Sequence, residues 1–314
     1  MILSTLIGFP LISEALDKAG AGDTISLADG VFTEENLITV RGGEEGKPLV
    51  IVGGKDAVIN SGKSNRGILV THSWVTLAGF SVDGKVGDKE VADSYVGKCV
   101  YVQGQEDPTT MSYGGEDVES SLVGFVMEDM FIHNCGDECV RLRNFVTNSM
   151  ILNNEIENCG IHDYHFESDG KNGEGIYIGT SSNQWKNGPD GCNDNFVNGN
   201  TITTNGNECV DIKEGATGNL IEDNSCSSQR DPNSGCFDSR GDKNTFRYNT
   251  ATNCRGAGVR LGGWKVDGHQ YGVENNVYGN DFINCDNGAL NVNTIKQGKI
   301  CGNSCEGGIC GITG

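Results

Sequence analysis

The stretch from 207 to 215 (NECVDIKEG) brings an amine and carboxylates close together in the chain. Two apolar residues alternate there with Cys209, Asp211 and Lys213, so an extended strand would carry the thiol, the carboxylate and the amine on one face. Glu208 lies directly before this strand. A lysine can exchange a proton near neutral pH when burial and like charge lower its pKa. The stretch therefore predicts a proton-transfer group, Lys213, beside oxygen ligands for a cation.

The same phrase recurs along the chain at intervals of roughly 20 to 35 residues, which is typical of a solenoid whose coils pack only against their neighbours. The clearest copies are 138–143, 174–179, 208–213, 236–240, 257–262 and 289–293. Several are followed by a phrase of the form N-x-[ILFV]-x-x-N, as at 219–224, 244–249 and 275–280. Asparagine tolerates left-handed backbone in turns, and stacked asparagines form side-chain ladders. We therefore expect stacked coils with asparagine at their corners.

Stacking these strands gathers charged side chains into columns on the outward face. One column is predicted to read Arg141, Tyr177, Asp211, Asp238, Arg260 and Asn291. The next is predicted to read Arg143, Gly179, Lys213, Arg240, Gly262 and Asn293. A third set of acidic residues precedes the strands: Glu138, Glu174 and Glu208.

Adjacent coils lie ~4.8 Å apart, so Lys213 and Arg240 would be neighbours. Stacked carboxylates at this spacing repel one another unless a cation lies between them. Glu174, Glu208 and Asp211 are therefore predicted to form a metal site, and calcium suits such oxygen ligands. The alternative is a solvated sheet face with weak ion pairs, each worth ~0–1 kcal/mol.

The N-terminal part of the chain predicts how this solenoid starts. Residues 11–19 have helical apolar spacing and end at Gly20. Residues 21–32 then read as a strand and a turn. This pair resembles the opening of right-handed parallel β-helix proteins, in which a helix caps the first coil and covers its open edge. We expect an all-β, right-handed parallel β-helix that spans 1–314 as one domain. The segment 83–120 departs from the rhythm and predicts an insertion, centred on a loop at 107–116.

Composition bounds the function. The net charge of −20 argues against a nucleic-acid partner, and no apolar run is long enough to span a bilayer. Residues 1–10 are too short, and lack the basic flank, for a complete signal peptide. Thirteen cysteines nevertheless indicate a secreted protein, which we expect to be a monomer.

The cysteines recur in Asn-Cys pairs that mark one turn column. Cross-coil disulfides Cys135–Cys159 and Cys254–Cys285 are predicted from that column. The alternative is a ladder of buried free cysteines. Cys301, Cys305 and Cys310 are expected to close the last coil.

The charged columns suit β-elimination from a uronic acid polymer. That reaction needs a cation to offset the carboxylate and acidify the C5 proton, a base to remove the proton, and an acid to assist the leaving oxygen. The sequence resembles the pectate-lyase-like β-helix superfamily, nearest to the polysaccharide lyase family of chondroitinase B and alginate lyases. The resemblance at the site covers 205–263, where 208–213 matches a strand pattern E-x-[IV]-x-[IV]-K and 218–224 matches G-N-x-I-x-x-N.

This resemblance implies roles for individual residues. It makes Lys213 the base, Arg240 the acid or carboxylate neutraliser with Arg260 as its rival, and Glu208 part of a calcium site. Two positions depart from the family pattern. Gly206 stands where the family has a second glutamate, and 259–263 reads VRLGG in place of a leucine-arginine-histidine-glycine phrase.

Other side chains on the same coils could bind an anionic polysaccharide, because aromatic faces pack on sugar rings and basic groups pair with carboxylates. The predicted substrate-binding residues are Arg141, Arg143, Tyr177, His162, His165, Trp264, His269 and Tyr271. A histidine is also an alternative proton shuttle, with His162 and His165 as the better candidates.

Three other functions fit parts of the pattern. A glycoside hydrolase on this fold would use two carboxylates, and Asp211 and Asp238 on adjacent coils could approach to ~5 Å. A uronate C5-epimerase removes the same proton as a lyase and returns one to the other face. A carbohydrate-binding module would use the repeats as a scaffold without catalysis.

Overall fold

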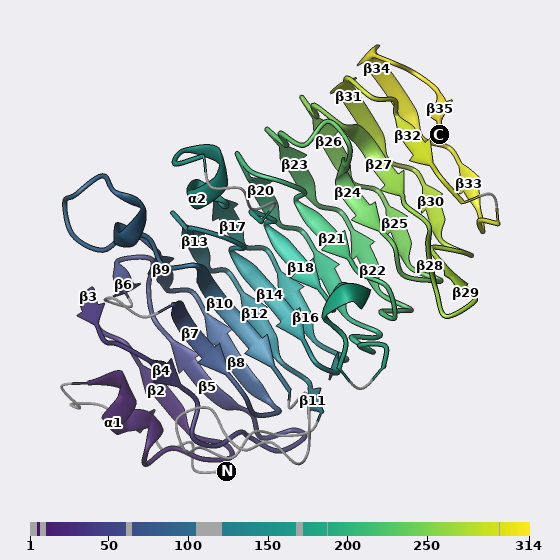
Figure 1. Cartoon of the computed structure of the whole chain (residues 1–314). Coiled ribbons are helices and arrows are strands. Elements are labelled where there is room, and N and C mark those ends of the chain that lie inside the picture. Colours follow the sequence, from purple (N-terminus) through teal and green to yellow (C-terminus); the bar gives the residue numbers. More distant parts are fainter. Residues whose placement is uncertain are drawn as a thin grey trace.

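The computed structural model describes residues 5–6, 11–60, 65–104, 121–167, 172–186, 188–294 and 296–314. Three long parallel sheets run along the molecule, and from Thr24 onward the chain visits them in rotation, one strand of each per coil (Figure 1). The fold is a right-handed parallel β-helix, as predicted.

Sheet I begins each coil. Its strands are β1 (Thr5–Leu6), β2 (Thr24–Ser26), β5 (Leu49–Val52), β8 (Val75–Ala78), β12 (Val126–Glu128), β16 (Met150–Leu152), β19 (Phe196–Asn198), β22 (Leu220–Glu222), β25 (Thr245–Arg247), β30 (Asn276–Tyr278) and β33 (Ile300–Cys301).

Sheet II follows in each coil. Its strands are β3 (Gly30–Thr33), β6 (Ala57–Asn60), β9 (Ser81–Asp83), β13 (Phe131–His133), β17 (Glu155–Glu157), β20 (Thr201–Thr203), β23 (Ser225–Ser227), β26 (Thr250–Thr252), β31 (Asp281–Cys285) and β34 (Ser304–Gly308).

Sheet III completes each coil and carries the charged columns. Its strands are β4 (Leu37–Ile38), β7 (Arg66–Val70), β10 (Lys98–Gln103), β14 (Val140–Arg143), β18 (Ile176–Ile178), β21 (Val210–Ile212), β24 (Gly235–Ser239), β27 (Ala257–Leu261), β32 (Leu290–Val292) and β35 (Ile312–Thr313).

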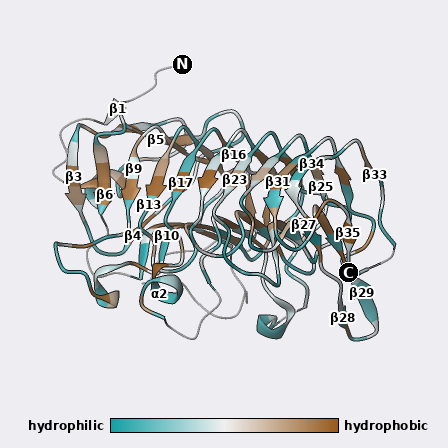
Figure 2. Ribbon diagram, turned by 90° about the horizontal axis from the view of Figure 1, so that it is seen from above, coloured by the Kyte–Doolittle hydropathy of each residue, from teal (hydrophilic) through white to brown (hydrophobic). Residues whose placement is uncertain are grey.

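A few short elements lie outside these sheets. They are α1 (Ile12–Leu16), the 3₁₀ turns η1 (Ala92–Ser94) and η2 (Ser182–Gln184), α2 (Ile161–Tyr164), the parallel pair β11 (Leu122–Val123) and β15 (Val146–Thr147), and the antiparallel hairpin β28 (Trp264–Val266) and β29 (His269–Tyr271). In Figure 2, α2 and this hairpin project from the side on which β4, β10, β27 and β35 of sheet III lie. They therefore flank the face that carries the charged columns. Among the described residues, no helix is long and apolar enough to cross a membrane.

The interior is built from the apolar half of each alternating strand. In sheet III, Val140, Ile176 and Val210 stack in one inward row that continues through Phe237 and Val259. All of them are fully buried. Because strand side chains alternate between faces, fixing this inward row also fixes which residues point outward.

Two kinds of asparagine column line the corners. Buried asparagines form hydrogen bonds between successive coils. The Oδ1 atom of each asparagine accepts from the backbone and side-chain N–H groups of the asparagine in the preceding coil. One such ladder contains Asn154, Asn200, Asn224, Asn249, Asn280 and Asn303, and another contains Asn195, Asn219, Asn244 and Asn275. A different, more exposed column holds the left-handed asparagines, including Asn134, Asn158 and Asn253. The predicted ladder and the predicted left-handed backbone are both present, in separate columns.

The capping helix is shorter than predicted. Helix α1 covers only 12–16 of the expected 11–19, and it lies at the N-terminal end of the solenoid (Figure 1). Its side chains Ile12, Ala15 and Leu16 are buried in the common core. The carboxylate of Glu34 accepts hydrogen bonds from the first two helical N–H groups, at 2.5 and 3.0 Å. These contacts join the helix to the first coil.

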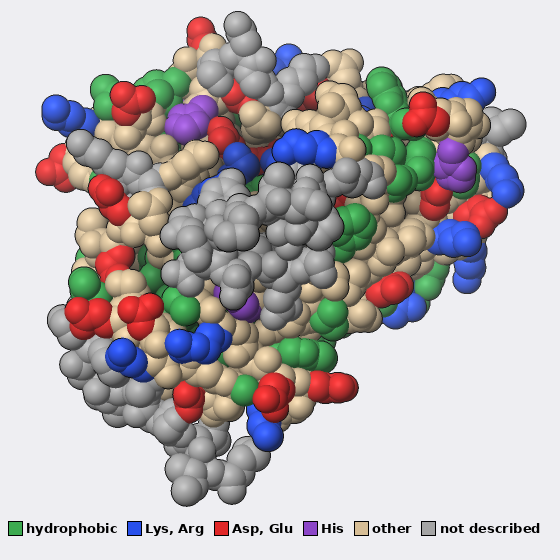
Figure 3. Space-filling view, turned by 60° about the horizontal axis from the view of Figure 1, so that its bottom comes forward, with side chains coloured by type: hydrophobic (Ala, Val, Ile, Leu, Met, Phe, Trp, Pro, Cys, Tyr) green, Lys and Arg blue, Asp and Glu red, His purple; other side chains and the backbone are tan. Residues whose placement is uncertain are grey.

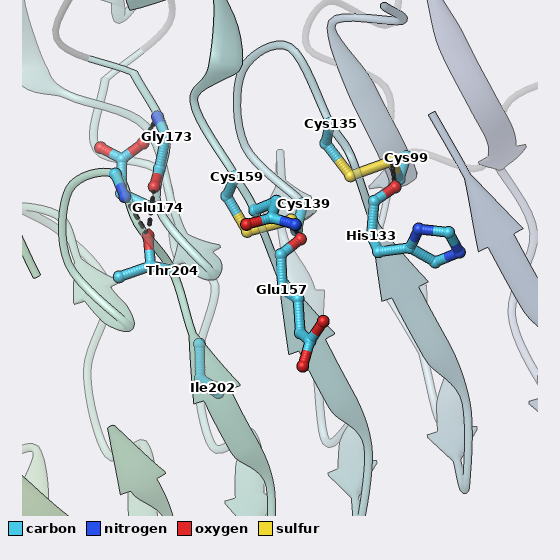
Figure 4. Close-up of a disulfide and its surroundings, with 12 residues drawn as sticks. Cys99, His133, Cys135, Cys139, Glu157, Cys159, Gly173, Glu174, Ile202 and Thr204 are labelled. Atoms are coloured by element: carbon cyan, nitrogen blue, oxygen red, sulfur yellow. Dashed lines mark hydrogen bonds between the residues drawn. A yellow bond between two sulfur atoms is a disulfide. The ribbon is translucent and has the colours of Figure 1, made fainter. Parts of the chain in front are cut away.

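The predicted disulfides Cys135–Cys159 and Cys254–Cys285 are wrong. The structure pairs Cys99–Cys135, Cys139–Cys159, Cys209–Cys226, Cys236–Cys254 and Cys305–Cys310. The first four each begin at the start of a sheet III strand. Three of them reach the corner after sheet II in the next coil, whereas Cys209–Cys226 reaches the middle of strand β23. Cys99–Cys135 and Cys139–Cys159 are drawn in Figure 4. Cys209 is therefore buried in the corner, and the prediction that its thiol shares the outward face of Asp211 is also wrong.

Cys285 would complete this series of disulfides, but it forms none. Cys285 occupies the next corner position, but Gly258 stands in register with Cys236 at the start of β27. Cys192 and Cys301 are also free. The last coil is closed by Cys305–Cys310 without Cys301.

Part of the segment 83–120 is regular. Residues 98–103 form β10, which pairs with β7 and β14 in sheet III. The loop at 107–116 lies outside the described residues.

Candidate active site on sheet III

The outward columns predicted from the sequence are present in the strand register. Arg141, Tyr177, Asp211, Asp238, Arg260 and Asn291 pair in succession across sheet III. The residues one step after each strand form the second column, in which the backbone N–H of Arg240 donates to the Ile212 carbonyl and that of Lys213 to the Ile178 carbonyl. Arg143 begins this second column at the end of β14. On the face shown in Figure 3, Lys and Arg side chains gather beside Asp and Glu side chains near the middle of the molecule.

Lys213 is almost enclosed, with its side chain 12% exposed. Its Nζ atom forms an ion pair with Oδ2 of Asp211 and lies 4.6 Å from the centre of the Tyr177 ring. Burial alone would lower the pKa of Lys213, but the negative charge of Asp211 and the neighbouring Tyr177 outweigh it and raise the pKa above its usual value. The prediction from the sequence that the pKa of Lys213 is lowered is therefore wrong.

Three buried carboxylates meet beside this lysine. Glu174, Glu208 and Asp211 each offer an oxygen, and these oxygens lie within 4.8 Å of one another. Burial and the charges of Glu208 and Glu138 raise the pKa of Glu174 well above its usual value. Burial together with Asp211 and Asp238 raises the pKa of Glu208 to about 7.

This group could hold a metal ion. Oδ2 of Asp211 accepts from Lys213, whereas its buried Oδ1 has no hydrogen-bond partner. A bound cation would satisfy that oxygen and offset the repulsion that raises the neighbouring pKa values. The three ligands supply only carboxylate oxygens, which hard cations such as calcium prefer.

The two candidate arginines are held differently. Arg240 forms an ion pair with the buried Glu214 at 3.1 Å, and its guanidinium lies 5.9 Å from the Trp264 ring. Arg260 is bound on two sides: its Nε donates to Asp238 at 2.5 Å, and its Nη1 donates to the Asn233 carbonyl at 2.8 Å. Arg240 Nη2 also lies 3.5 Å from the Ser181 hydroxyl, so the contacts of Arg240 are longer than those of Arg260.

A serine links the carboxylates. The hydroxyl of Ser234 lies against Oε1 of Glu208 and 2.7 Å from Oδ2 of Asp238. Since a hydroxyl has one proton, it donates to one of these oxygens at a time. Ser234 thus couples the carboxylates of neighbouring coils.

The N-terminal side of the site is a dense ion-pair network. Arg141 donates to Glu138 at 2.5 Å and lies 4.4 Å from the centre of the Tyr177 ring. Lys98 lies 3.1 Å from Glu138 as well. Burial raises the pKa of Tyr177 to about 12, with Lys213 and Arg141 opposing the rise. Arg141 and Tyr177 are thus fixed in the wall of the site.

The structure separates His162 in α2, and His165 directly after it, from the carboxylate group. Both ring nitrogens of His162 have protein partners, the Asp137 carboxylate at 3.0 Å and the Ala92 carbonyl at 3.2 Å. His165 is exposed and lies 3.4 Å from Glu90, beside a pocket of about 330 Å³. Neither histidine contacts Lys213 or its carboxylate partners in any recorded hydrogen bond or ion pair of the described residues.

The three remaining candidates lie on the hairpin at the other end of the site. Trp264 faces Arg240, and Tyr271 packs edge-on against Trp185 with ring centres 5.7 Å apart. The His269 ring lies 3.6 Å from Asp242. Trp264 and Tyr271 pair directly across the hairpin, so they share one face of it.

Sequence reasoning missed Ser234, Glu214 and Lys98. Glu214 directly follows Lys213, and Ser234 lies just before β24, so both were adjacent to singled-out residues. Lys98 precedes Cys99 in a strand concealed by the irregular segment. The signal for all three was the column register, because each occupies a position next to a predicted column.

Comparisons with known proteins bear on the fold. No family model matches the chain, and no curated protein matches it. Among solved structures, the alginate lyase from Paenibacillus sp. str. FPU-7 superposes with a TM-score of 0.70 over 96% of both chains, at 19% identity. Pectate lyase Pel9A superposes with a TM-score of 0.61 over 96% of this chain and 71% of its own, at 13% identity. These similarities show the fold, a right-handed parallel β-helix.

Proposed function

We propose that this protein is a secreted, monomeric polysaccharide lyase that cleaves a uronic-acid-containing anionic polysaccharide by β-elimination. The observation that carries this proposal is the position of Lys213, buried against Asp211 with Arg240 beside it and three carboxylate oxygens within 4.8 Å of one another. Basic side chains meet the substrate carboxylate, and a lysine lies where a proton can be removed. The five disulfides fit an oxidising compartment.

In the proposed reaction, neutral Lys213 takes the C5 proton through Nζ. The electrons of the C5–H bond form the C4=C5 double bond, the C4–O bond breaks, and the leaving oxygen takes a proton from the arginine that assists it or from water. Arg240 lies next to Lys213 in the column, where it can pair with the substrate carboxylate or assist the leaving oxygen. Arg260 keeps Asp238 in place through its two-sided contacts.

Lys213 must be neutral to act as a base, whereas its ion pair with Asp211 favours the charged form. Glu174, Glu208 and Asp211 would hold calcium, which when bound would neutralise the substrate carboxylate and acidify the C5 proton. Lys213 then has to leave Asp211 to reach the substrate. During the reaction the Lys213 side chain therefore exchanges its contact with Asp211 for a contact with the substrate.

A glycoside hydrolase is the second candidate, and one observation favours it. The pKa of Glu208, raised to about 7, is suited to a general acid. The two carboxylates expected from the sequence are less suitable as catalytic groups. Asp211 is held in an ion pair with Lys213, and Asp238 is held in an ion pair with Arg260. A hydrolase would thus use Glu208 as its acid.

The test is ultraviolet absorbance of the unsaturated product on alginate, polygalacturonate, polyglucuronate and a glycosaminoglycan, each with calcium and then with chelator. We expect a rise on one of these polymers, and loss of that rise under chelator. New reducing ends without absorbance would instead support the hydrolase. Sugar binding without new ends would support the epimerase or the carbohydrate-binding module.

A further inference from the structure

A second hollow lies beyond Arg240, between the β28–β29 hairpin and the turn after β32. Its volume is about 680 Å³, and its lining includes Gly263, Trp264, Lys265, Gln270, Thr294 and Lys296. Gly262, in the same column as Lys213 and Arg240, lies against the side chains of Arg240 and Arg260, because a Cβ atom there would come within 3.3 Å of Arg240 Cγ and 3.5 Å of the Arg260 guanidinium. We refer to this hollow as the hairpin pocket.

The floor of the hairpin pocket has an unused polar group. Thr294 is only 8% exposed, and its buried hydroxyl has no hydrogen-bond partner. Gly263 makes room for it, because a Cβ atom at 263 would collide with that hydroxyl and crowd the amide of Gln270. A buried hydroxyl without a partner costs free energy, so rotation of the Thr294 side chain toward a ligand that bonds to its hydroxyl would be favoured.

The charge of the hairpin pocket is opposite to that of the whole chain. The protein carries 43 acidic and 23 basic residues, yet the described lining contains Lys265 and Lys296 and no carboxylate. His269 also lines the pocket, and its ring lies 3.6 Å from Asp242 outside the lining. Lys296 pairs with Glu274 outside the lining at 2.6 Å. No ion pair to Lys265 occurs among the residues that the structure describes. An anionic group is therefore the matching ligand.

The hairpin pocket also offers an aromatic face. Trp264 is 51% exposed although it is large and apolar, and its ring lies between the pocket and Arg240. Tyr271 pairs with it across the hairpin and is braced by Trp185. A flat ring of this kind packs against the apolar face of a sugar.

We propose that the hairpin pocket is a second subsite that binds a uronate residue of the polysaccharide at a distance from the bond that is cleaved. Strand β32 is three sheet steps from β21, so this sugar would lie roughly 14 Å from the Lys213 strand. Trp264 would pack on the ring, Lys265 would pair with the carboxylate, and Thr294 would bond to a hydroxyl. This subsite rests on the proposed function, and it predicts that the chain prefers long substrates.

The test is calorimetric titration of wild-type and Lys213→Ala protein with hexasaccharides of alginate, polygalacturonate and polyglucuronate, each beside its carboxyl-reduced neutral form. Trp264→Ala and Lys265→Gln should each weaken uronate binding about tenfold, the usual scale for a contact that anchors a ligand. The controls are Tyr248→Ala, which removes an aromatic ring that is 54% exposed on another face, and Lys299→Gln, which removes an exposed lysine before β33. Both controls should stay within about twofold.

Thr294→Val separates binding from structure. Replacing an unpartnered buried hydroxyl by a methyl group should leave the melting temperature equal or higher while hexasaccharide affinity falls. A variant that weakens the fold as well as binding would instead indicate a structural role.

The outcomes distinguish the subsite from the proposed function. The subsite is wrong if no hexasaccharide binds wild type, if the carboxyl-reduced forms bind as well as the uronates, or if Trp264→Ala binds like the Tyr248→Ala control. Binding through Trp264 with no unsaturated product from any polymer would contradict the lyase and keep the subsite. Product formation with unchanged affinity in Trp264→Ala would contradict the subsite alone.

Discussion

The asparagine ladders and the outer face of sheet III both bury rows of polar groups, but they satisfy them differently. Asn224 and Asn249 are neutral, and each side-chain amide both donates and accepts along its ladder. On sheet III the buried groups are charged, and Oδ1 of Asp211 and Oδ1 of Asp238 have no hydrogen-bond partner. Buried polar groups in proteins are usually satisfied, so the unsatisfied row indicates where a ligand completes the structure.

The largest effect should come from Lys213. Lys213→Ala is expected to lower kcat about a thousandfold, the range for loss of a general base. Lys213→Arg keeps the positive charge beside Asp211 but cannot act as a base near neutral pH. Steady-state kinetics of both variants, with circular dichroism to check folding, separate the two roles. Near-normal activity in Lys213→Arg would remove Lys213 as the base and leave it as an ion-pair partner.

Glu208 should make stability depend on pH. Its pKa is raised from 4.5 to about 7 on folding, so the folded state binds the proton more tightly than the unfolded state. This stabilisation is complete below about pH 4.5 and is lost as the pH rises through 7, up to about 3 kcal/mol. Denaturant unfolding of metal-free protein should therefore show stability falling from pH 5 to pH 8, and less so in Glu208→Gln.

Calcium sharpens this prediction. Since ionised carboxylates bind a cation more tightly, calcium should raise the melting temperature more at pH 8 than at pH 5. Glu174→Gln should reduce that calcium effect, because Glu174 belongs to the same group of oxygens. An equal calcium response in wild type and variant would place any bound ion elsewhere.

The two arginines should separate activity from stability. Arg240→Gln is expected to lower kcat/KM about a hundredfold, since one charge-stabilising donor is lost. Arg260→Gln should act mainly on the free energy of unfolding, because Arg260 compensates the buried Asp238. Kinetics and denaturant unfolding of both variants check this. The reverse pattern would make Arg260 the neutraliser.

A break in the ladder should affect stability alone. Asn249→Ala leaves the backbone N–H of Asn224 without its acceptor, at a cost of about 2 kcal/mol in the free energy of unfolding. Asn287→Ala is the control outside the ladder: Asn287 lies in a half-buried turn, its amide donates one hydrogen bond to the Pro232 carbonyl, and the loss should stay within about 1 kcal/mol. Activity per folded molecule should be unchanged in both. A change in kcat for Asn249→Ala would show that the ladder is coupled to the site.

The columns followed from alternation, and the fold followed from the repeat together with the resemblance of the N-terminal helix and first coil to β-helix openings. Once Val210 and Ile212 point inward, their outward neighbours are fixed, and the repeat copies that pattern into each coil. The disulfides did not follow, because the pairing depends on the diagonal geometry of a corner. The cysteines before sheet III, such as Cys139 and Cys236, form a second column that pairs with the Asn-Cys column of the next coil. Cys209 belongs to the same second column but pairs with Cys226 inside β23.

The site was predicted as a set of residues but not as a network. The register brought Lys213, Arg240 and Asp211 together as expected. Whether Lys213 meets Asp211 or stands free decides the sign of its pKa shift, and that depends on side-chain rotamers that strand periodicity does not specify. Ser234 was missed because its role exists only between two coils.

The most direct test of the account is mass spectrometry of the products formed from a polyuronate oligosaccharide in deuterated water, then returned to ordinary water so that only carbon-bound deuterium remains. A lyase gives two fragments whose masses sum to that of the substrate, one with an unsaturated end, and we predict this result. Fragments that together exceed the substrate by one water would establish a hydrolase. An uncut substrate with deuterium at C5 would establish an epimerase, and either result would contradict β-elimination at Lys213.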